Sequence, residues 1–147
     1  MLLRMQVRAL SFVVVALAAV AARAEAPIKI EATLCKKLVG DKCFDVTAKF
    51  TRDAAALHGW WKSTDGREGM IVRTVWIAED VGAAAPRNTK IDEKSVKLAA
   101  GILGKLATHW TGTLSLSRPN NGWPVGKYRA EIWFGGKLAT TLHLTIE

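Results

Sequence analysis

The chain alternates apolar and polar residues over several short stretches, and this alternation limits its fold more than any other feature. Successive side chains of a β-strand point to opposite faces, so alternation with period two predicts strands with one buried face. The run 70–78 is almost continuously apolar, which predicts a strand covered on both faces. We therefore expect an all-β chain of about seven strands; the alternating stretches cover residues 28–34, 44–50, 57–61, 110–117, 127–134 and 138–146.

The alternation also predicts which side chains are buried. In the second stretch, one face carries Phe44, Val46, Ala48 and Phe50, and we expect that face to point into the core. Six tryptophans are present in the chain. Three of them fall on faces expected to be buried: Trp61, Trp76 and Trp110.

The segment 92–106 fits two secondary structures. Its apolar residues recur at helical spacing, with Asp92 and Glu93 suited to a helix N-terminus. Gly101 and Gly104 would weaken such a helix by about 1 kcal/mol each. Alternate residues of the same segment are also apolar, as in a strand. We favour a strand and keep one short helix near 92–106 as the alternative.

The N-terminus has the features of an export signal. Arg4 and Arg8 precede a short apolar run, and residues 22–24 give the small-x-small pattern of a cleavage site. We therefore predict a cleaved signal peptide over residues 1–24 and a single domain over 25–147. No cysteine lies at the cleavage point for a lipid anchor, so the protein is expected to be periplasmic or secreted.

The charge of the predicted mature chain is modest. The whole chain has 21 basic and 13 acidic residues. Cleavage after residue 24 removes three arginines, which leaves 18 basic residues against 13 acidic ones and a net charge of +5. These charges are scattered and form no run or stripe, so we expect no nucleic-acid partner.

Cys35 and Cys43 are the two cysteines of the chain. In an oxidising compartment an even number of cysteines predicts a disulfide, and Gly40-Asp41 between them favours a turn. The spacing differs from the C-x-x-C pattern of redox-active pairs. We predict a structural disulfide between Cys35 and Cys43.

The residues of common catalytic and metal sites do not form a recognisable pattern. The three histidines, at positions 58, 109 and 143, show no metal-ligand spacing such as H-x-H, so no metal site is predicted. No serine lies in a G-x-S-x-G elbow. The glycines of "FGGK" precede a strand rather than a helix, so they are not a phosphate loop. We expect no enzymatic activity and no cofactor.

The C-terminal stretch "LSLSRPNNGWPVGKYRAEIWFGGKLATTLHLTI", residues 114–146, combines Gly-Trp-Pro-x-Gly-x-Tyr with two alternating strands around Gly-Gly-Lys. It resembles the closing hairpin of small secreted or periplasmic bacterial immunoglobulin-like domains, most of them uncharacterised. The resemblance implies an immunoglobulin-like antiparallel β-sandwich. It implies no activity, since this fold serves many functions.

Exposed aromatic residues beside polar groups are the remaining functional candidates. The alternation points Trp60 and Trp133 away from the core, and Arg129 and Glu131 share the outward face of Trp133. We therefore predict a non-catalytic protein that binds an envelope protein or glycan through Trp60, Arg129, Glu131 and Trp133. The alternatives are a membrane-interacting protein that uses a cationic amphipathic segment 94–106, and a small hydrolase.

Overall fold

The computed structural model describes residues 26–99 and 109–147. These residues form nine β-strands, and the only helix among them is the single 3-10 turn η1 (Gly82–Ala84). The predicted signal peptide, 1–24, lies outside the described residues. The strands are β1 (Ile30–Val39), β2 (Lys42–Val46), β3 (Lys49–Phe50), β4 (Ala56–Ser63), β5 (Ile71–Asp80), β6 (Thr89–Lys97), β7 (Trp110–Ser117), β8 (Gly126–Phe134) and β9 (Lys137–Ile146).

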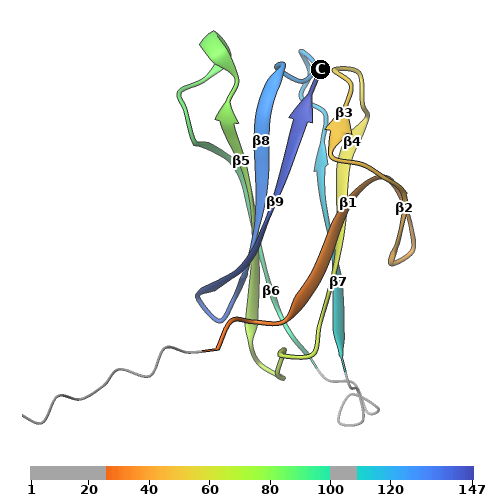
Figure 1. The fold of residues 1–147 in the computed structure, drawn as a ribbon, viewed down its shortest axis with the longest axis vertical. Coiled ribbons are helices and arrows are strands. Elements are labelled where there is room, and N and C mark those ends of the chain that lie inside the picture. The colour runs from red at the N-terminus through yellow and green to blue at the C-terminus, as the bar shows by residue number, and fades with distance from the viewer. Residues whose placement is uncertain (1–25, 100–108) are drawn as a thin grey trace, which may run out of the picture.

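The strands form two sheets that pack face to face (Figure 1). One sheet has four strands in the order β2-β1-β4-β7, and the other has five in the order β3-β9-β8-β5-β6. The all-β prediction is confirmed, although the described residues form nine strands rather than about seven. One pair departs from the predicted antiparallel arrangement, because the two-residue strand β3 runs parallel to β9. The segment that follows β2 thus leaves the four-stranded sheet and joins the edge of the other.

Large aromatic side chains fill the space between the sheets. The ring of Trp61 from β4 meets the ring of Phe134 from β8 edge to face, with centroids 5.1 Å apart. Trp61 and Trp76 are buried, as predicted, whereas Trp110 is only partly buried. Trp123, for which the alternation predicted no position, is among the most deeply buried residues and packs edge to face with Tyr128. Aromatic side chains therefore supply much of the contact between the two layers.

The β8–β9 hairpin has the strands and the turn that the sequence predicts. Buried and part-exposed residues alternate along β8, and the buried ones are Tyr128, Ala130, Ile132 and Phe134. Gly135 and Gly136 have φ values of +57° and +83°, which a residue with a Cβ adopts only at a cost. A bulge between Ile132 and Trp133 changes the register, so Trp133 lies opposite Leu138.

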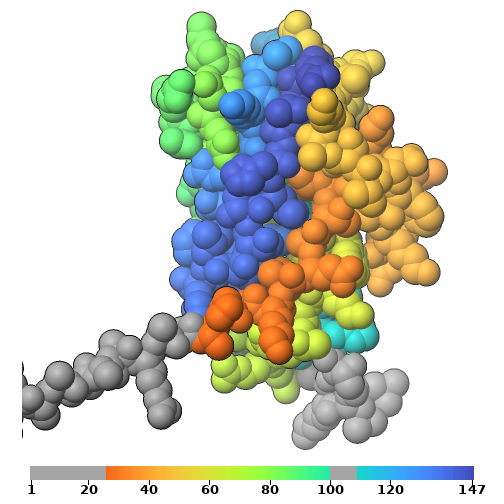
Figure 2. Space-filling view, viewed as in Figure 1, coloured from red at the N-terminus to blue at the C-terminus, as the bar shows by residue number. Residues whose placement is uncertain are grey.

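The prediction of one strand over residues 44–50 with a buried face is wrong. Asp45 has a φ of +56°, and the segment divides into the separate strands β2 and β3. Phe50 is buried, but Phe44, Val46 and Ala48 are exposed. The reason is that β2 pairs only with β1, and the β1–β2 hairpin projects beyond the body of the sandwich (Figures 1 and 2).

The segment 92–106 is only partly described. Residues 92–97 belong to β6, which pairs with β5, so a helix over that part is excluded and the favoured strand is confirmed. Residues 100–106 lie outside the described part of the chain. No helix among the described residues is long and apolar enough to cross a membrane.

Candidate functional site

The four predicted binding residues do not form one surface. Trp60 lies on β4 in the four-stranded sheet, whereas Arg129, Glu131 and Trp133 lie on β8 in the other sheet. All four are partly exposed and point away from the core. They therefore occupy the two opposite outer faces of the molecule. Alternation reports the direction of a side chain within its strand, but it does not report which sheet the strand joins.

On the five-stranded sheet, Arg129 is the centre of a set of polar contacts that we call the Arg129 network. The guanidinium Nε donates to Glu131 at 3.1 Å, and Nη1 donates to the side-chain oxygen of Asn88 at 2.8 Å. Glu79 lies 3.7 Å from Arg129 and 3.1 Å from the ring of His143. The polar groups of this face are thus largely occupied by one another.

Trp133 is also occupied by its neighbours on that face. Its indole N–H donates to Glu131 at 3.2 Å, and the guanidinium of Arg73 lies over its ring, 4.8 Å from the centroid. Arg73 in turn donates to Glu93, which also accepts from Lys90. Hydrogen bonds from Lys90 and then Arg73 lower the pKa of the Glu93 carboxyl. The contacts of Trp133 are typical of cross-strand packing, and they already engage its indole N–H and one face of its ring.

The surroundings of Trp60 are different. Trp60 lies directly opposite Thr33 of β1 on one side and Thr113 of β7 on the other. Two residues earlier in β4, on the same face, the ring Nδ1 of His58 lies 2.7 Å from the hydroxyl of Ser115. Burial lowers the pKa of His58. The outer face of this sheet therefore carries an aromatic ring beside hydroxyl groups, with Glu31 and Lys62 opposite each other two residues beyond Trp60.

The projecting β1–β2 hairpin turns this face into a groove. The groove has a volume of about 400 Å³ and is lined by Thr33, Asp41, Lys42, Cys43, Phe44, Val46, Trp60 and Thr111. We call it the Trp60 groove. Phe44 is 47 % exposed and Val46 68 % exposed, so one wall is apolar and open to solvent. The alternating pattern included Phe44 and Val46, but it predicted that both would be buried in the core.

The disulfide between Cys35 and Cys43 supports that wall. It confirms the predicted bridge, and no cysteine of the chain is left free. Cys35 is fully buried and lies opposite His58 of β4, whereas Cys43 lines the groove next to Phe44. The disulfide thus links the two strands of the projecting β1–β2 hairpin beside the groove. A disulfide of this kind is typical of an oxidising, extracytoplasmic environment.

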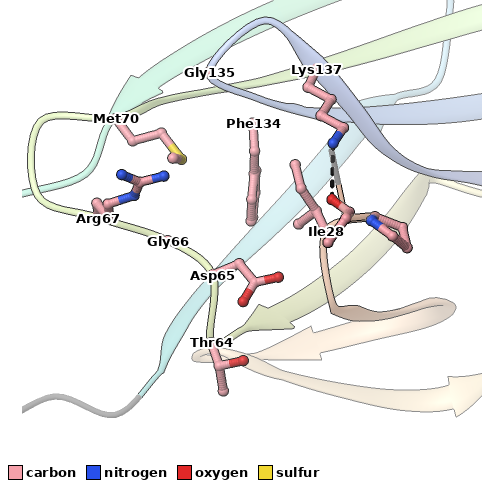
Figure 3. Close-up of a pocket in the computed structure, with 11 residues that line it drawn as sticks. Ile28, Thr64, Asp65, Gly66, Arg67, Met70, Phe134, Gly135 and Lys137 are labelled. Atoms are coloured by element: carbon pink, nitrogen blue, oxygen red, sulfur yellow. Dashed lines mark hydrogen bonds between the residues drawn. The ribbon is translucent and has the colours of Figure 1, made fainter. Parts of the chain in front are cut away.

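A larger cleft lies at one end of the sandwich and has a volume of about 620 Å³ (Figure 3). Its polar groups hold the N-terminal segment in place. The Asp65 carboxylate accepts a hydrogen bond from the backbone N–H of Lys29, and the Lys137 ammonium donates to the carbonyl of Ala26. The buried Ser63 hydroxyl donates to the carbonyl of Lys29. These hydrogen bonds join the segment 26–29 to the ends of the neighbouring strands, so they have a structural role and do not indicate a ligand site.

The described histidines, cysteines and carboxylates form no candidate metal site. Within residues 26–99 and 109–147, no group of three or more His, Cys, Asp or Glu side chains could hold a metal ion. The Glu79 and Glu131 carboxylates both contact the Arg129 guanidinium. Their arrangement is explained by that shared cation.

Comparison with known proteins gives little more. No protein-family model matches the chain, and no curated protein matches it. Among solved structures, it is similar to a mutant β-glucosidase from Listeria innocua in complex with laminaribiose, with 14 % identity, a TM-score of 0.44 and coverage of 82 % of this chain. The same enzyme in complex with glucose gives the same identity and TM-score over 81 % of this chain. The chain spans 16 % of the length of each of these structures.

Proposed function

We propose that this chain is an exported, non-catalytic, immunoglobulin-like β-sandwich that binds a glycan of the bacterial cell envelope in the Trp60 groove. The observation that carries the proposal is the position of Trp60. Its indole lies on the outer face between Thr33 of β1 and Thr113 of β7, and it lines the same groove as a second exposed aromatic ring, that of Phe44.

Two features support the immunoglobulin-like assignment. Tyr128, near the start of β8, donates its phenolic O–H to the carbonyl of Pro124 at 2.6 Å. In immunoglobulin-like domains a tyrosine at this corner makes the same kind of bond to backbone a few residues upstream. The closing hairpin, whose sequence resembles that of secreted bacterial domains, also has its predicted buried face. The Cys35–Cys43 disulfide supports export.

The chemistry of the groove favours a glycan. A sugar ring has an apolar face of C–H bonds and a rim of hydroxyl groups, so it fits an aromatic surface flanked by hydrogen-bonding side chains. The Trp60 groove offers both, with hydroxyls from Thr33 and Thr111 and charged groups from Asp41 and Lys42 at its rim. A stable protein partner usually buries about 800 Å² on each side, so it would have to contact many residues beyond those that line this groove.

The test is titration of the protein with soluble oligosaccharides released from cell-envelope polymers, followed by calorimetry. We expect saturable binding that Trp60→Ala weakens at least about tenfold, which corresponds to about 1.4 kcal/mol. Trp133→Ala is the matched control, because it removes the same partly exposed side chain from the opposite outer face. Equal weakening by both variants, or no binding by the folded wild-type protein, would contradict the proposal.

A further inference from the structure

Strand β7 is an edge of the four-stranded sheet that lacks the usual protection. It pairs with β4 on one side, and no described strand lies on its other side. Its sequence, WTGTLSLS, contains no charged residue and no proline. All eight of its residues pair with β4 in an unbroken register. An open, regular and uncharged edge of this length is a template for pairing with another strand.

The other three edges are protected in recognisable ways. β6 carries five charged residues in nine positions, and its pairing with β5 is interrupted by an irregularity. β2 has five residues and is distorted at Asp45, and β3 has only two. Natural proteins use charge, distortion and shortness to prevent edge-to-edge association. Only β7, among the described edges, lacks all three devices.

We propose that β7 pairs antiparallel with β7 of a second copy, so that two four-stranded sheets join into one eight-stranded sheet across a twofold axis. β7 is self-complementary in this arrangement. If Leu114 lies at the axis, Thr113 faces Ser115 of the second copy and Gly112 faces its Leu116. Hydroxyl residues then meet hydroxyl residues on the outer face, and apolar residues meet on the inner face. Such cross-strand pairs stabilise antiparallel sheets, and no like charges face each other.

Apolar surface beside β7 supports a second copy of the chain as the partner. Val96, on the neighbouring edge strand of the other sheet, is 61 % exposed. A cavity of about 350 Å³ opens between β6 and β7, where its lining includes Val72, Trp76, Val96 and Leu98. A second copy added along β7 extends over this side of the sandwich and removes part of that apolar surface from water.

The dimer has a consequence for the outer face of the sheet. Trp60 lies opposite Thr113, one strand in from the edge. Pairing through β7 therefore places the two Trp60 side chains on one continuous sheet, separated by three strand spacings or at least roughly 14 Å. The interface does not depend on what the Trp60 groove binds, so the dimer and the glycan binding are independent proposals and each has its own test.

The test is sedimentation velocity of the purified protein across a wide concentration range. We expect a dimer whose fraction rises with concentration. Thr113→Lys and Thr113→Glu should each give folded monomers, because the two introduced like charges then lie on the same outer face, diagonally across the twofold axis, and repel each other. An equimolar mixture of these two variants should recover the dimer, which a merely misfolded variant cannot do.

Ser95→Lys on β6 is the matched control, since it adds the same charge to the other long edge strand, and it should leave the dimer intact. Three results would overturn the proposal. They are a wild-type protein that is monomeric at every concentration, a dimer that survives Thr113→Lys, and a dimer that Ser95→Lys abolishes instead.

Discussion

Trp60 and Trp133 point away from the core on opposite sheets, so these two partly exposed tryptophans lie on different outer faces of the molecule. Trp133 is covered by Arg73 and bonded to Glu131, whereas Trp60 lies in an open groove beside Phe44. This difference makes the two residues natural controls for each other in any binding experiment.

Removing the disulfide should lower stability and loosen the wall of the Trp60 groove. For Cys35→Ala with Cys43→Ala we expect a loss of about 2.5 kcal/mol in the free energy of unfolding, from the entropy of closing the short loop. Urea denaturation measures it. Reductant should destabilise the wild-type protein and leave the double variant unchanged. A reductant effect on the variant would show that the loss has another source.

Gly126 should tolerate no side chain. Its φ is +152°, and a Cβ there would lie 2.2 Å from the backbone carbonyl oxygen of Asp80, which cannot move as a side-chain tip could. We expect Gly126→Ala to cost about 3 kcal/mol or more, from overpacking together with backbone strain. Gly136→Ala is the control, because that site also has a positive φ but no atom within 4 Å. Equal losses in thermal or urea unfolding would contradict the steric explanation.

Tyr128→Phe should lose about 1 kcal/mol of stability, because the bond to the Pro124 carbonyl disappears. Burial raises the pKa of Tyr128 above its ordinary value of 10.0. The unfolded chain therefore releases this proton first, and stability falls as the pH rises above 10. The difference in unfolding free energy between wild type and variant should shrink over that range. A constant difference would contradict the assignment.

His58 should make the protein less stable in mild acid. Burial lowers its pKa below 6.5, so the unfolded chain binds a proton before the folded chain does. The contribution of His58 to the free energy of unfolding is therefore fully present above pH 6.5 and decreases as the pH falls below that value. In His58→Gln this part of the pH dependence should disappear, as measured by urea unfolding between neutral and acidic pH. Parallel curves for the two proteins would show that other groups cause the acid sensitivity.

The sequence predicted those parts of the fold that depend on local pattern. The β8–β9 hairpin follows from alternation and from two glycines with positive φ, and the disulfide follows from two cysteines around a turn. The position of Phe44 and Val46 did not follow. Alternation separates the two faces of a strand, but whether either face meets a second layer depends on long-range packing. Among the described strands, β2 pairs with β1 alone. The same limit made Trp60 and Trp133 look like neighbours.

The most direct test of the central claim is a two-dimensional NMR titration of the indole N–H signals with the oligosaccharide that binds. The chain has six tryptophans, and each can be assigned by substitution. We predict that the Trp60 signal shifts and saturates with the calorimetric affinity, while the Trp133 signal stays in place. A titration that moves the Trp133 signal and leaves the Trp60 signal unchanged would contradict the account.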